Sequence, residues 1–150
     1  MRKFVFNLEP LYGHRQRLEE LKQKEFAEVN QSLQAEEKKL IELIATYKSS
    51  ASDLDKRKEQ GATVLEIETH HAYLEGLKRR IRTQELAVSN IRVLLEKKRA
   101  DLIDASRDRK VIEIMKEKSL NAHQQRAEKL ELKESDDLTS ARGRRRGNEN

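Results

Sequence analysis

The sequence contains no cysteine and no tryptophan, one proline, five glycines and only 4% aromatic residues. Without cysteine there are no disulfides and no thiolate chemistry, and the usual structural zinc sites are excluded. So few turn-forming residues in 150 positions indicate long helices with few connections. Because 39% of the residues are charged and 35% are hydrophobic, we expect no globular core of ordinary size.

Long apolar runs are also missing. No stretch approaches the roughly 18 apolar residues of a membrane-spanning helix, and the first residues lack the apolar segment of a signal peptide. Lys and Arg exceed Asp and Glu by 32 − 27 = 5, and residues 139–150 supply much of this excess with four Arg and one Glu. We therefore expect a cytoplasmic protein with no direct membrane span, whose body carries mixed charge and whose basic tail is disordered.

What the sequence does contain is a heptad repeat of apolar residues. A first row recurs every seven residues: Ile67, Leu74, Ile81, Val88, Leu95 and Leu102. A second row starts three residues after Leu74 and consists of Leu77, Gln84, Ile91, Lys98, Ala105 and Ile112. Two rows at this offset form one narrow stripe along a helix, since seven residues make almost two turns. Such a stripe must be buried against another helix.

The first third of the chain supplies a matching stripe. Its main row consists of Phe26, Leu33, Leu40, Tyr47 and Leu54, and Ile44 and Ala51 belong to a parallel row. If the two stripes pair antiparallel, the numbers of facing residues add to 121, as for Leu33 with Val88. The same register places Glu37 opposite Gln84 and Gln23 opposite Lys98, either as polar layers that fix the register or as recognition elements. Leu11, Leu18 and Leu21 do not follow this grid, so we expect a heptad skip between Leu21 and Phe26.

The sequence thus predicts an all-α fold, a long two-helix antiparallel coiled-coil hairpin that forms a single domain over residues 1–138. Helix one is expected over about 8–54 and the turn over about 55–63, where Thr63 and Glu66 have the spacing of a capping box. The longer helix two is expected over about 64–138, with Gly76 on its solvent side, and is followed by the disordered tail 139–150. Residues 113–138 have no predicted mate in the chain, so another molecule can dock there.

No catalytic or cofactor-binding motif occurs, and a two-helix rod lacks a concave pocket, so we expect neither enzymatic activity nor a cofactor. His70 and His71 diverge by about 100° on a helix and have no third ligand nearby, which favours ordinary helix residues over a metal site. Tyr47 and Tyr73 lack surrounding basic residues for base stacking, and nucleic acid is not an expected partner. A generic coiled-coil scaffold or homodimer and, less favoured, a basic nucleic-acid binder remain the alternatives.

Two segments of the chain resemble recurring blocks of a known family. Residues 4–11 read Phe-Val-Phe-Asn-Leu-Glu-Pro-Leu and are followed by Arg15 and Arg17. Residues 105–118 read Ala-Ser-Arg-Asp-Arg-Lys-Val-Ile-Glu-Ile-Met-Lys-Glu-Lys. Both blocks resemble the flagellar export protein FliJ family, and the length, charge and hairpin register agree with this resemblance. It implies a non-enzymatic, stalk-like component of the flagellar type III export apparatus, at the inner face of the cell membrane and similar to the central stalk of rotary ATPases.

The resemblance also implies partners and contact residues. FliJ proteins insert into the hexameric flagellar export ATPase, contact the cytoplasmic region of the export gate protein FlhA and assist export chaperones. By resemblance, the gate contact is expected on Tyr47, Tyr73, Leu77, Arg80 and Gln84. Because Tyr47, Leu77 and Gln84 also lie on the predicted seam, a purely structural role for these three is equally open. The ATPase contact is expected at the end that carries both termini, including Arg107, Arg109, Lys110 and Lys116.

Overall fold

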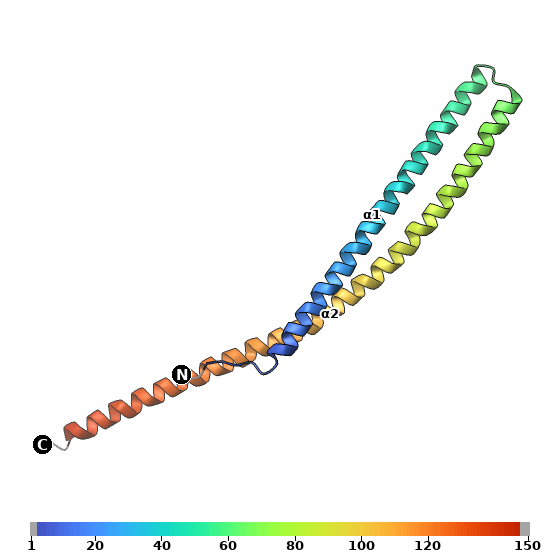
Figure 1. Ribbon diagram of the computed structural model, residues 1–150. Helices are drawn as coiled ribbons and strands as arrows, with labels where there is room; N and C mark the ends of the chain where they lie inside the picture. Colours follow the sequence, from blue (N-terminus) through green and yellow to red (C-terminus); the bar gives the residue numbers. More distant parts are fainter. Residues whose placement is uncertain (1–2, 148–150) are drawn as a thin grey trace. The chain divides into compact units, whose positions relative to one another are not determined.

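The computed structural model consists of two antiparallel α-helices, α1 (Glu9–Glu59) and α2 (Val64–Gly147), joined by a tight turn (Figure 1). It describes residues 3–147, and the side chains up to residue 144. There is no strand in this part of the chain. The predicted all-α hairpin with a longer second helix is therefore confirmed.

The contacts within the chain fall into two units. One unit is Glu20–Ile103, which holds the turn and the adjoining parts of both helices. The other is Met1–Glu19 together with Asp104–Asn150. The first boundary lies beside Leu21, next to the predicted heptad skip. Both helices continue through the boundary without a break.

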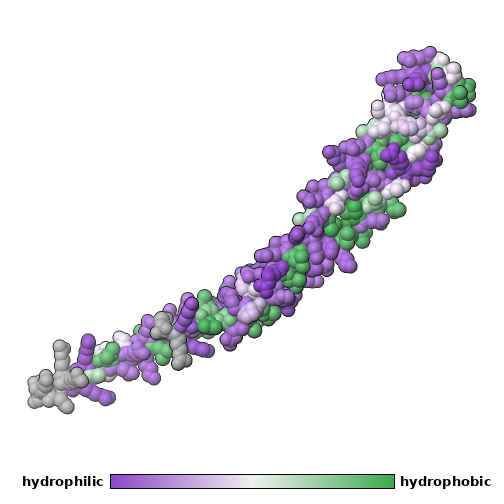
Figure 2. All heavy atoms as spheres, viewed as in Figure 1, coloured by the Kyte–Doolittle hydropathy of each residue, from purple (hydrophilic) through white to green (hydrophobic). Residues whose placement is uncertain are grey.

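The core of the unit Glu20–Ile103 is the seam between α1 and α2. One cluster joins Leu33 to Val88 and Leu95, and a second joins Leu54 to Leu74 and Leu77. Leu33 and Val88 are a predicted facing pair, and every predicted seam position of α2 is buried or half-buried. Hydrophilic side chains cover most of the face in Figure 2, with hydrophobic patches between them. The fold is held by a narrow stripe rather than a broad core.

The turn between the helices is closed by two standard capping arrangements. At the end of α1, Gly61 takes a positive φ of 88°. The N–H of Ala62 donates to the carbonyl of Arg57 (3.0 Å) and that of Gly61 donates to Lys58 (3.3 Å), which is the Schellman pattern. At the start of α2, the N–H of Glu66 donates to Thr63 Oγ1 and the N–H of Thr63 donates to Glu66 Oε2. The predicted capping box is confirmed.

Both helices end later than the sequence predicts. α1 continues past Leu54 to Glu59, because the charged residues that follow Leu54 are good helix formers even though they lack an apolar period. α2 continues past Leu138 to Gly147 and so includes most of the segment predicted as a disordered tail. Extending an existing helix needs no new nucleation, which explains helix formation without a tertiary partner. The remaining predicted tail residues, 148–150, lie outside the described residues.

In the unit of the two chain ends, the N-terminal segment lies along α2 (Figure 1). The ring of Phe4 meets that of His123 edge to face at 5.5 Å, and Lys116 reaches Glu9 at 2.9 Å. Ala105 and Ile112 are buried in this unit. The prediction that residues 113–138 have no mate is therefore wrong up to His123. It failed because the non-helical segment before Glu9 carries no heptad and was not given a partner.

Candidate functional site

One open groove in the unit Glu20–Ile103 runs between α1 and α2. It is lined from α1 by Lys39, Glu42, Leu43 and Thr46, and from α2 by Tyr73, Gly76, Leu77, Arg79, Arg80, Thr83 and Gln84. The α2 residues recur at intervals of three and four and so occupy one face of the helix. The groove brings together four of the five predicted gate-contact residues; Tyr47 does not line it.

The four predicted residues in the groove differ in what they can offer a partner. Leu77 is 2% exposed and belongs to the core. Gln84 Nε2 donates to the backbone carbonyl of Glu36 (2.9 Å) and to its carboxylate (2.6 Å), so its amide is already engaged across the seam. Tyr73 is half exposed and Arg80 is exposed. A partner can therefore reach the side chains of Tyr73 and Arg80 most directly.

The fifth predicted residue, Tyr47, is a seam residue. It is half-buried and packs against the cluster of Leu54, Leu74 and Leu77. The ammonium group of Lys78 lies 5.9 Å from the centre of its ring, within the range of a cation–π interaction. These contacts give Tyr47 a clear structural role, and its contact with the gate stays a prediction.

The groove is positively charged. Lys39, Arg79 and Arg80 line it, against one carboxylate, Glu42. Lys39 is paired with Glu36 at 2.8 Å, and the hydrogen bonds from Lys39 and then from Gln84 lower the pKa of the Glu36 carboxyl. Among the described residues neither Arg79 nor Arg80 has a carboxylate within 4.0 Å. Two cations beside apolar side chains suit a segment that is both acidic and apolar.

Sequence reasoning missed several residues of the groove, namely Lys39, Glu42, Arg79 and Gly76. The signal was present for Gly76, because it lies three residues after Tyr73 and four before Arg80, on the same helix face. It is half-buried in the groove rather than simply on the solvent side. A glycine within a helix destabilises it by about 0.5–1 kcal/mol relative to alanine. This cost calls for an explanation.

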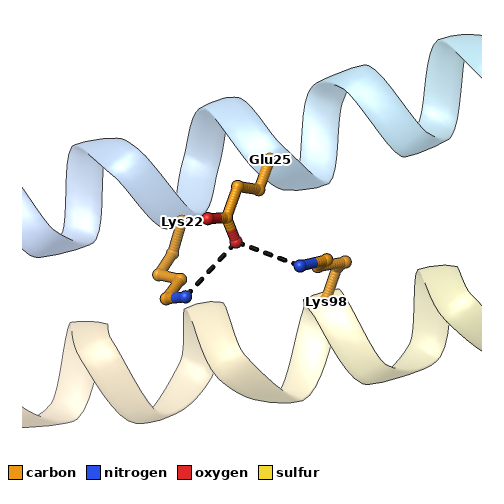
Figure 3. A network of polar contacts seen from close by, with 3 residues as sticks. All are labelled: Lys22, Glu25 and Lys98. Carbon is orange, nitrogen blue, oxygen red and sulfur yellow. Dashed lines mark hydrogen bonds and ion pairs between the residues drawn. The ribbon is translucent and has the colours of Figure 1, made fainter.

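The polar layers of the seam use partners different from those predicted. Gln84 bonds to Glu36 and not to Glu37, and Lys98 pairs with Glu25 at 3.2 Å and not with Gln23. Lys22 lies 3.3 Å from the same carboxylate oxygen. Figure 3 shows Lys22 and Lys98 on opposite sides of this carboxylate. Side chains this long reach past the residue directly opposite, which a sum of residue numbers cannot describe.

The stability that the ion pairs of Glu25 give to the seam depends on pH. Hydrogen bonds from Lys98 and then from Lys22 lower the pKa of the Glu25 carboxyl below its usual value. Because the folded pKa is the lower one, these pairs stabilise the seam above the carboxyl pKa of the unfolded chain. The stabilisation is lost as the pH falls through the lowered pKa.

The predicted ATPase-contact residues lie together on α2, in the unit of the chain ends, but their surroundings differ. Arg109 pairs with Glu19 of α1 and with Glu113 (2.7 Å), and Lys116 pairs with Glu9 (2.9 Å). Both therefore hold α1 against α2. Arg107 is exposed, and Lys110 is 63% exposed with only a 3.6 Å contact to Glu113. These last two cations are the ones that face solvent.

Beyond His123, α2 presents apolar side chains to solvent. Leu130, Leu132 and Leu138 are each more than 60% exposed.

Within the described part of the chain, no three His, Cys, Asp or Glu side chains are placed to hold a metal ion. Neither described helix has a stretch long and apolar enough to cross a membrane. His70 Nε2 donates a hydrogen bond to the backbone carbonyl of Ser50 (2.9 Å), across the seam.

Comparison with known proteins gives a match to one family. The family model described as "Flagellar FliJ protein" matches residues 4–148, nearly the whole chain. The matched range includes both segments in which the sequence resembles that family, residues 4–11 and 105–118. Searches of curated proteins and of solved structures find no match.

Proposed function

Because this chain belongs to the flagellar FliJ family and is a component of the flagellar export apparatus, we propose that it links the hexameric export ATPase to the export gate. One end of the hairpin binds the ATPase and stimulates its hydrolysis of ATP, and the groove binds the cytoplasmic region of FlhA. In this role the chain needs no catalytic group, since the ATPase hydrolyses ATP. Binding to the gate holds the chain at the inner face of the cell membrane, where it also assists export chaperones.

The observation that carries this proposal is the separation of the two predicted contact sets. The gate set lies in the unit Glu20–Ile103, and the ATPase set lies on α2 in the unit of the chain ends. Both helices run unbroken from one unit into the other. A link between two proteins requires two such surfaces on one continuous support, whereas a simple binding module requires one.

The chemistry of the two surfaces differs in a way that suits two partners. The groove combines Tyr73 and Leu43 with the cations Arg79 and Arg80, which favours a mixed acidic and apolar ligand. The other surface presents Arg107 and Lys110 to solvent. Exposed cations of this kind act mainly by steering an acidic partner into register.

Reversing the charge of Arg80 tests the gate contact. Arg80 is exposed and lines the groove, so Arg80→Glu is expected to weaken binding to the FlhA cytoplasmic region about tenfold, the effect of about 1.4 kcal/mol. Isothermal titration calorimetry measures the affinity, and circular dichroism is expected to show unchanged helicity. Arg82→Glu is the matched control, because Arg82 is exposed on the same helix and does not line the groove. Equal affinities of the two variants would contradict the gate assignment.

A further inference from the structure

Gly76 is not required by the backbone of α2. Within the described chain, Gly61 is the glycine with a positive φ, so Gly76 has an ordinary helical conformation open to any residue. Glycine nevertheless destabilises a helix interior, because it gains more freedom than other residues when the chain unfolds. The conformation of the helix therefore gives no reason for glycine here.

Packing within the chain gives no reason either. A Cβ atom added at Gly76 would meet nothing closer than the guanidinium of Arg79, at 3.8 Å, which is an ordinary van der Waals distance. No atom of α1 lies within 4 Å of this added Cβ atom. Alanine would therefore fit, and the helix would be more stable with it.

Because Gly76 has no side chain, the groove stays open at this position. Gly76 lines it between Tyr73 and Arg80, with Leu77 beside it. We propose that Gly76 forms a notch that receives one apolar side chain of the gate segment bound in this groove. This inference rests on the proposed gate contact and adds the residue that determines how deeply the partner can seat.

The surroundings of the notch define the segment that fits it. Tyr73, Leu77 and Leu43 give the notch apolar neighbours. Arg79 and Arg80 lie three and four residues after Gly76, one helical turn farther along α2. Neither has a carboxylate partner among the described residues. The occupant is therefore a segment of the gate protein with an apolar side chain flanked by Asp or Glu.

A substitution that fills the notch separates this role from a structural one. Gly76→Leu is expected to raise the melting temperature, since leucine is a better helix former, while weakening binding to the FlhA cytoplasmic region at least tenfold. Gly76→Ala is expected to raise the melting temperature with a smaller loss of affinity. Ala72→Leu is the matched control: it adds bulk at an exposed position of α2 outside the groove and is expected to leave the affinity within twofold.

Thermal unfolding by circular dichroism and calorimetric titration with the FlhA cytoplasmic region measure both quantities on the full chain. Normal gate affinity of Gly76→Leu, together with weak binding by Arg80→Glu, would overturn the notch and leave the proposed function standing. A lowered melting temperature of Gly76→Leu would overturn it in favour of a packing role. If the unsubstituted chain does not bind the gate, both proposals fall. If Gly76→Leu abolishes self-association instead of gate binding, the occupant is a second copy and the inference is wrong.

Discussion

Val88→Asp is expected to remove a large share of the stability of the hairpin. Val88 is 2% exposed and packs with Leu33 and Leu95 in the centre of the seam. An aspartate there buries a carboxylate without a partner, at a cost of more than about 3 kcal/mol. Because small proteins are stable by only about 5–15 kcal/mol, this is a large share of the total. Urea unfolding followed by circular dichroism measures the loss.

Val93→Asp is the matched control for this experiment. Val93 lies on the same helix in the same unit but is 70% exposed. The same substitution there is expected to change the free energy of unfolding by no more than about 0.5 kcal/mol. If the two variants were equally stable, the seam would not lie where the heptads and the structure place it.

The double reversal Arg107→Glu with Lys110→Glu is expected to reduce stimulation of the export ATPase at least tenfold. Both side chains face solvent, so the change leaves the hairpin intact while it replaces two cations by two anions. Like charges placed against a complementary surface cost several kcal/mol. Arg109 and Lys116 are left unchanged, because their ion pairs to Glu19 and Glu9 hold α1 to α2.

The rate of ATP hydrolysis by the purified hexamer, with and without each variant, measures this effect. Lys129→Glu with Lys133→Glu makes the same change of charge at exposed positions farther along α2 and serves as the control. Unchanged stimulation by the first double variant would count against an ATPase contact at this end. A loss of equal size in the control would indicate a non-specific effect of net charge.

The seam could be predicted from the sequence because the heptad spacing repeats many times along each helix. Val88, Leu77 and Ala105 are buried as the two rows require, and Thr63 with Glu66 caps α2 as their spacing indicates. Each of these predictions depends on residues close in sequence or on a period repeated many times. A local spacing or a repeated period identifies the buried residues even when the exact facing partner is misplaced by one or two residues.

Features that depend on a single long-range contact were not predicted. The segment before Glu9 has no helical period, and nothing in its pattern indicates that Phe4 meets His123. The partners of Gln84 and Lys98 were predicted one or two residues away from those observed, since long side chains select among several neighbours. The ends of both helices were placed too early, because charged residues extend a helix without leaving an apolar signature.

The candidate site was predicted in part. The family resemblance indicated the α2 face that carries Tyr73 and Arg80, and the structure places both on one groove. The sequence did not indicate that Lys39 and Glu42 of α1 also line the groove. The groove's lining depends on how the side chains of the two helices are placed beside the seam, and a heptad pattern does not specify this. The role proposed for Gly76 could be inferred only from the structure, which shows open space around an added Cβ atom.

The central claim is that one copy of this chain joins the export ATPase and the export gate at the same time. Analytical ultracentrifugation of the chain mixed with the ATPase hexamer and the FlhA cytoplasmic region tests it directly. We expect a ternary complex that contains all three proteins and is lost with Arg80→Glu. If the FlhA region instead releases the chain from the ATPase, the two partners compete for one surface and the linking role is contradicted.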